Sequence, residues 1–167
     1  MNFIELEKNF WLYANTIRHN PFKIFIKIIM IFSPIKIGSL EVSNRIVVAP
    51  MCQYSAINGV MTDWHTQHLM QLGYSAAGLI MVEATAVEKI GRITHNCVGI
   101  YDNKCIVSLK KNLQLAKSVA PNKSCFGIQL AHAGRKASTQ RPWEGRSALT
   151  KVEKPWKTIS PSPIPFQ

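Results

Sequence analysis

Three segments of the chain share one pattern, a run of apolar, β-favouring residues that ends in small and polar ones. The runs begin at Arg45, Leu79 and Cys125. Strands that are buried on both faces of a parallel sheet read as continuous Val, Ile and Leu runs rather than as alternating ones. The pattern therefore predicts three buried parallel strands, the first over about 45–49 and the third over about 125–130.

Helical patterns fill the two gaps between these runs. A β-α-β-α-β order requires parallel strands joined by right-handed helical crossovers, so the chain is predicted to have an α/β fold. Pro121 lacks a backbone N–H and is expected to close the second helix. The first helix is expected from Thr62 or Asp63 to about Ala76, before Gly78, and the second from Asp102 or Asn103 to about Val119.

The flanking segments differ from this central unit. Residues 34–43 alternate around Gly38-Ser39, which predicts a hairpin. The tail over 137–167 holds five prolines among Ser, Thr, Arg and Trp, and is expected to be a long loop without regular structure. Residues 1–30 form an atypical extension whose apolar part, 20–32, is too short to span a bilayer. That part is either an amphipathic segment for a membrane surface or an added leader before a domain over 31–167.

Composition narrows the possible partners and the compartment. The net charge of +11 permits a nucleic acid, an anionic lipid or a phosphorylated cofactor, but the basic residues are scattered and no nucleic-acid-binding motif is visible. A solvated basic surface without a nucleic acid partner is the preferred interpretation. Four cysteines without a C-x-x-C pair, and no recognisable secretory signal, favour reduced thiols and a cytoplasmic location. His65 and His68 have the spacing of a metal pair but no third ligand is signalled, so they are interpreted as helix-packing residues and no metal is expected.

Six segments in this order resemble the old yellow enzyme family, and most closely its bacterial branch of thermophilic-like ene-reductases, NADPH dehydrogenases and xenobiotic reductases. A later segment, 140–145, resembles a loop of some xenobiotic reductases. The resemblance covers the chain from about Ile31 to its last residue. The six segments are Phe32–Ile37, Asn44–Tyr54, Asp63–His68, Val82–Val87, Gly91–Ile93 and Gly127–Lys136.

The resemblance implies the N-terminal part of a TIM (β/α)8 barrel, here a hairpin with about three strands and two helices. It also implies FMN at the carboxyl ends of the strands, reduced by NADPH or NADH and reoxidised by an activated alkene, an α,β-unsaturated carbonyl compound as the small-molecule substrate. A complete barrel needs ~250 residues, and phosphate sites in such barrels form after strands seven and eight. The strongest anchor for FMN is therefore expected outside these 167 residues.

The same resemblance assigns site residues at the three strand ends. Cys52 would lie against the flavin ring and tune its potential through an S–H or thiolate interaction, and Tyr54 would direct its phenol to a substrate carbonyl. His132, Arg135 and Lys136 come just past the end of the third strand, and this position alone places them at the mouth of the site, without a catalytic step. The residues expected to line the flavin are Ala49, Pro50, Met51, Cys52, Ala84 and Gln129.

Two hypotheses for the function remain open at this point. The first is an ene-reductase whose N-terminal portion is encoded here. The second is a non-catalytic remnant or half-barrel that acts only by association with another chain, as a homo-oligomer or with a complementary polypeptide. Open strand edges and an uncovered barrel interior would favour such association.

Overall fold

The computed structural model describes residues 30–121 and 124–166. The hypotheses for residues 1–29 concern a part of the chain outside these described residues, and the boundary at residue 30 stays a prediction. The chain divides into two compact units, Met1–Ile46 and Val47–Gln167. Across the described ranges, no helix is long and apolar enough to cross a membrane.

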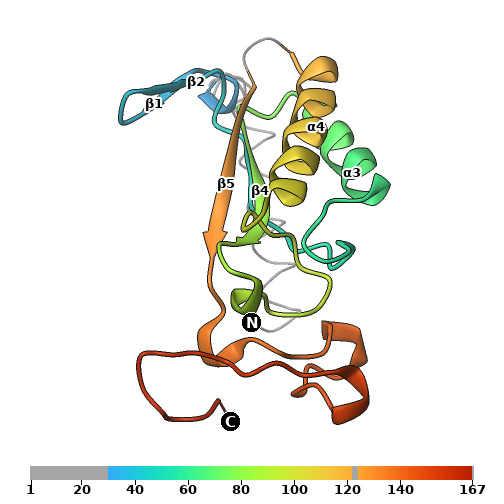
Figure 1. Ribbon diagram of the computed structural model, residues 1–167. Coiled ribbons are helices and arrows are strands. Elements are labelled where there is room, and N and C mark those ends of the chain that lie inside the picture. Colours follow the sequence, from blue (N-terminus) through green and yellow to red (C-terminus); the bar gives the residue numbers. More distant parts are fainter. Residues whose placement is uncertain (1–29, 122–123, 167) are drawn as a thin grey trace, which may run out of the picture. The chain divides into compact units, whose positions relative to one another are not determined.

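The first unit contains the predicted hairpin. Strands β1 (Ile35–Ile37) and β2 (Leu40–Val42) pair antiparallel (Figure 1). Gly38 lies in the turn between them with a φ of 59°, a left-handed conformation that glycine adopts at no steric cost. The hairpin prediction is therefore confirmed, and the turn residue explains its position.

The second unit is built on a parallel sheet in the order β3-β4-β5. Its two helices pack against each other and lie on the same side of β4 and β5 (Figure 1). The predicted α/β order is confirmed by these elements, which are β3 (Val47–Val48), α3 (Asp63–Tyr74), β4 (Leu79–Ala86), α4 (Asn103–Val119) and β5 (Cys125–Ala131).

Strand β3 is shorter than the predicted 45–49 because its flanking N–H groups cannot join the ladder with β4. The N–H of Arg45 donates to the Ile31 carbonyl at 2.8 Å, and that of Ile46 donates to Asn44 Oδ1 at 3.0 Å. Pro50 has no N–H at all. The sequence marked the strand correctly but could not show that its first residues bond elsewhere.

The helix starts follow the predicted caps. The Asp102 carboxylate accepts the N–H of Cys105 at 2.9 Å and caps α4. At α3, the cap is completed by a histidine, because the N–H of Thr62 donates to Nδ1 of His65 at 3.0 Å. Helix α3 ends at Tyr74 rather than Ala76, since Ala76 has a left-handed φ of 61° that stops the helix.

The core of the second unit lies between the helices and the sheet. Gly73 of α3 permits close contact with α4, because a Cβ there would lie 2.6 Å from the Ala116 carbonyl oxygen. Phe126 and Ile128 of β5 pack on the same cluster from the sheet. The buried members are Ala56, Met61, Leu69, Val82, Val98, Leu109 and Ala116.

The tail predicted to lack regular structure contains two short 3-10 turns, Pro142–Glu144 and Lys151–Glu153, so that prediction is wrong at these points. The tail lies beyond the carboxyl ends of β4 and β5 (Figure 1). An isolated antiparallel bridge between Thr139 and Ala148 closes its first part into a hairpin-like loop. Backbone hydrogen bonds therefore order a segment in which the sequence shows mainly prolines.

Candidate functional site

The carboxyl ends of β4 and β5 bring two of the predicted residues together. Ala84 and Gln129 are register partners across the parallel ladder. Register partners on neighbouring strands direct their side chains to the same face of a sheet. A β-bulge at Glu83 precedes this pair, because Val82 still pairs with Ile128 while Ala84 pairs with the very next residue, Gln129.

The loop after β3 brings Cys52 to the same place. The thiol interacts with the backbone of Ala84, and the N–H of Gln53 donates to Oε2 of Glu83 at 3.0 Å. The Gln53 side chain adds a hydrogen bond from its amide to the Met51 carbonyl at 2.8 Å. Cys52, Ala84 and Gln129 are therefore consecutive neighbours along the ends of the three strands.

The remaining predicted ring-lining residues follow β3 directly. Val48 of β3 pairs with Ile80 of β4, which places the next residues, 49–51, beside β4. Ala49 and Met51 are exposed, and Pro50 is half-buried. Ala49 and Pro50 have small side chains and Met51 a flexible one, and the exposure of Ala49 and Met51 leaves room for a ligand at this edge.

Cys52 is a neutral thiol in this environment. Its pKa is raised to about 11, first by burial and then by the nearby Glu83 carboxylate and Cys97. Each of these surroundings disfavours a thiolate. Of the two interactions considered for Cys52, the structure favours the S–H form at neutral pH.

Tyr54 is held by its backbone and by an aromatic neighbour. Its φ of 50° is left-handed, which is uncommon for a bulky residue. The ring of Trp143 meets it edge to face, with centroids 5.6 Å apart and an interplanar angle of 84°. Burial raises the pKa of the Tyr54 phenol, Cys52 raises it too, and Arg146 opposes the shift. The phenol is thus a neutral O–H donor, and Trp143 is a neighbour that sequence reasoning missed.

A buried acid and base behind the loop were also missed. The Glu83 and His65 side chains are 4% and 2% exposed, and Oε1 of Glu83 lies 3.3 Å from Nε2 of His65, without the alignment of a hydrogen bond. Because His65 Nδ1 accepts the Thr62 N–H, the imidazole proton faces the carboxylate. The one signal in the sequence was a glutamate inside an otherwise apolar strand run.

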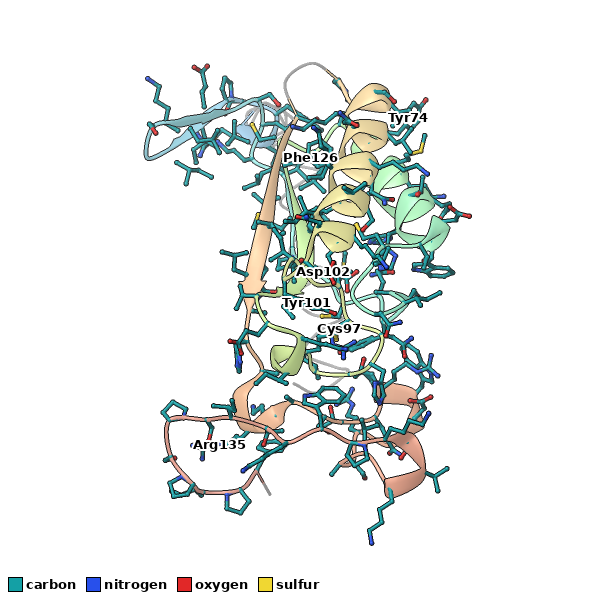
Figure 2. The ribbon with its side chains drawn as sticks, in the orientation of Figure 1. Tyr74, Cys97, Tyr101, Asp102, Phe126 and Arg135 are labelled. Carbon is teal, nitrogen blue, oxygen red and sulfur yellow. The ribbon has the colours of Figure 1, made fainter. Side chains whose placement is uncertain are left out.

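The other polar candidates are engaged in local structure. His132 lies 3.4 Å from Glu88, and Arg135 donates to Ser162 Oγ at 2.5 Å. Figure 2 shows Arg135 beyond the carboxyl end of β5, just before the tail. The ammonium of Lys136 lies 5.0 Å from the ring centre of Phe166. In the part of the chain that the structure describes, no three His, Cys, Asp or Glu residues are arranged for a metal ion.

The strand ends suit a flat ring with a polar edge. The Gln129 side chain is exposed, and its amide makes no hydrogen bond within residues 30–121 and 124–166. An amide offers both donors and an acceptor, which matches a pyrimidine-type edge. Ala84 carries only a methyl group beside it, so a planar ligand can approach the sheet closely.

Known proteins resemble this chain over most of its length. The sequence pattern of the NADH:flavin oxidoreductase / NADH oxidase family matches residues 30–162. An NADH:flavin oxidoreductase of Gibberella zeae is 43% identical over 137 residues, which are 80% of this chain and 32% of that protein. An NADPH dehydrogenase of Listeria monocytogenes serotype 4a is 36% identical over 138 residues, 81% of this chain and 36% of that protein. The old yellow enzyme from Pichia sp. AKU4542 superposes with a TM-score of 0.59 at 27% identity, over 65% of this chain and 28% of that one.

These comparisons confirm the predicted fold and its extent. The chain spans about a third of the length of the curated relatives that it matches. Its α/β fold is the N-terminal part of a TIM barrel, as in the old yellow enzymes. FMN, with NADPH or NADH as reductant, is the cofactor of this group. The chain belongs to the NADH:flavin oxidoreductase / NADH oxidase family.

Proposed function

We propose that this chain supplies one face of an FMN site in an NAD(P)H-dependent ene-reductase that acts on α,β-unsaturated carbonyl compounds. The observation that carries the proposal is the contiguous set formed by Cys52, Ala84 and Gln129 at one edge of the sheet. Ala49, Pro50 and Met51, which follow β3, extend this face beside β4. In TIM barrels such strand ends hold the chemistry.

Each side chain would contribute through its own chemistry. FMN, when bound, supplies the hydride transfer that no side chain can perform. The free amide of Gln129 would donate to and accept from the polar edge of the ring. The neutral phenol of Tyr54 would donate a hydrogen bond to the carbonyl oxygen of the alkene substrate and orient it. The neutral thiol of Cys52 would contact the ring and influence its potential.

The ring contact is tested by titrating the full chain with FMN and with riboflavin while flavin fluorescence is recorded. Both should be quenched weakly and with similar dissociation constants, because the described strands hold ring contacts whereas barrel phosphate sites follow strands seven and eight. Gln129→Ala should weaken both about three- to tenfold, the usual value of one hydrogen bond. A cofactor face elsewhere would leave the dissociation constants unchanged.

A matched control is Gln114→Ala, which removes an exposed amide from α4 rather than from the strand end. It should leave both dissociation constants as they are. Absence of any quenching in the unsubstituted chain would argue against a flavin face formed by these residues alone.

A second candidate function is association with another chain without catalysis. It is favoured by exposed apolar residues on β3 and β5, the two edge strands of the described sheet. Val47 of β3 and Leu130 of β5 are 50% and 63% exposed, and among the described strands each of β3 and β5 pairs only with β4. Unpaired strand edges are templates for pairing with another chain. A homo-oligomer and a complementary polypeptide are both compatible with this surface.

Light scattering after gel filtration tests this candidate. At micromolar concentration the chain is expected to elute as an associated species, and Leu130→Lys should shift it towards the monomer because a charge on an edge strand opposes pairing. Val152→Lys is the control, since Val152 is 91% exposed but lies in a 3-10 turn of the tail. A monomer at every concentration would exclude self-association.

A further inference from the structure

Glu83 is an unusual residue for its position. It lies in β4, where Val82 and Thr85 are also buried, and Glu83 itself is only 5% exposed. Burying a carboxylate costs several kcal/mol unless it is paired and hydrogen-bonded. The β-bulge at Glu83 interrupts the register with β5. The Glu83 side chain therefore need not follow the regular alternation of side chains along the strand.

The carboxylate lies directly behind the loop that carries Cys52. Its Oε2 accepts the N–H of Gln53, the residue that follows the cysteine, at 3.0 Å. Its Oε1 lies 3.3 Å from Nε2 of His65 on α3. The loop that carries Cys52 is thereby attached to β4 through the buried Glu83 carboxylate. The other oxygen of this carboxylate faces the imidazole of His65.

Few charged or titratable groups face the thiol. From β4 there is Glu83, from the segment before α4 there is Cys97, and from the loop itself there is Tyr54. On α3, His65 and His68 face the carboxylate rather than the thiol. Glu83 is therefore the acid among these neighbours and the one whose charge acts on Cys52 from inside the protein.

We propose that Glu83 is a positioning residue for Cys52: its buried carboxylate fixes the loop through the Gln53 N–H and, by its negative charge, adds to the burial that disfavours the Cys52 thiolate. The proposal deepens the proposed function, because it specifies the protonation state in which Cys52 would meet the flavin. Its chemistry, however, can be measured without flavin. Burial is the main cause of the high pKa of the thiol, about 11, and the Glu83 carboxylate is the next.

The test is the pH dependence of alkylation of Cys52 by iodoacetamide in the full chain, followed by mass spectrometry that resolves each cysteine. Glu83→Gln keeps an oxygen that can accept the Gln53 N–H but removes the charge. The midpoint of the Cys52 profile should move to lower pH. Below the midpoint, alkylation should be about threefold faster for each unit of that shift, because thiolate fraction rises tenfold while intrinsic nucleophilicity falls.

Two references separate this effect from general loosening. Glu88→Gln removes an equal charge from a 60% exposed side chain shortly after β4, and should leave the Cys52 profile in place. The profile of Cys125, at the start of β5, should be the same in all variants. An unchanged Cys52 midpoint in Glu83→Gln would overturn the proposal.

A further variant keeps the proposal testable if Glu83→Gln loses its helical circular dichroism. Glu83→Asp retains the negative charge on a shorter side chain, so the Cys52 midpoint should stay close to that of the unsubstituted chain and well above the value of an ordinary cysteine, about 8.5. A folded Glu83→Asp chain with an ordinary midpoint would show that the charge does not control the thiol. Neither result depends on flavin binding, so a failure here is distinct from a failure of the flavin site.

Discussion

Replacing Trp156 by alanine should lower the free energy of unfolding of the second unit by about 3 kcal/mol and release the tail from the strand ends. The estimate is the lower end of the range for removing a buried Trp side chain, because Trp156 is only half-buried. The substitution removes a large ring on which several unrelated parts of the chain converge. We therefore expect the largest effect in the tail itself.

The contacts of Trp156 explain this expectation. Its indole N–H donates to the Ile90 carbonyl at 2.9 Å. The Arg92 guanidinium lies 5.2 Å from the ring centre, and the His95 ring meets it edge to face at 5.0 Å. Arg92 is itself buried and bonded to the carbonyls of Lys89 and His95. The ring thus links the tail to the segment after β4, and its loss would leave a cavity and an unsatisfied carbonyl.

Urea denaturation measures the loss of stability, and hydrogen exchange of the Thr139 N–H, which donates to the Ile93 carbonyl at 2.9 Å, reports on the tail. Trp143→Ala is the matched control, since that ring is 64% exposed and should cost under about 1 kcal/mol. Equal losses for the two tryptophans, or unchanged exchange at Thr139 in Trp156→Ala, would contradict the prediction.

The order of the tail marks one limit of sequence reasoning. Its prolines correctly predict the absence of long helices and strands, because proline lacks the backbone N–H that the hydrogen bonds of a helix or a sheet require. The loop is nevertheless ordered by contacts with residues far away in sequence, such as Trp156 with Ile90. The composition of the tail does not indicate which distant residues it contacts. The edge-to-face contact of Trp143 with Tyr54 escaped prediction for the same reason.

The strands and helices of the second unit were more accessible to prediction. Continuous apolar runs and capping residues are local signals, and they located β4, β5 and the start of α4 at Asp102. The ends of β3 and α3 were less accurate, because they depend on hydrogen bonds of Arg45 and on the left-handed φ of Ala76. Each of these is fixed by the surroundings rather than by residue type.

Within the candidate site, resemblance supplied the surface residues and missed what supports them. Cys52, Ala84 and Gln129 were expected at the strand ends, and the structure brings them together. Their roles towards flavin, and that of Tyr54, stay predictions. The support comes from a β-bulge that changes the direction of Glu83, and a bulge has no reliable sequence signal in a run such as Val82–Val87.

The two histidines of α3, which share one helix face in the sequence, should behave very differently on substitution. His65→Ala is expected to cost about 3 kcal/mol, because leaving a buried polar group unsatisfied costs about 1–3 kcal/mol and more where that group is charged. It leaves the Glu83 carboxylate without its imidazole and the Thr62 N–H without its acceptor. His68→Ala should cost about 1 kcal/mol, since His68 is only half-buried. Burial lowers the pKa of its imidazole, which favours the neutral form, so no charged partner is lost.

A double substitution identifies the reason for the difference. If the cost of His65→Ala comes from an uncompensated buried charge, adding Glu83→Gln should recover part of the lost stability, because an amide is cheaper to bury than an unpaired carboxylate. Combining Glu83→Gln with His68→Ala should give no such recovery. The urea midpoints of five variants, with Glu83→Gln alone included, and of the parent chain decide the matter. Additive losses in the His65 series would mean that the imidazole supports α3 through its cap alone, and that Glu83 obtains its stabilisation from the Gln53 N–H.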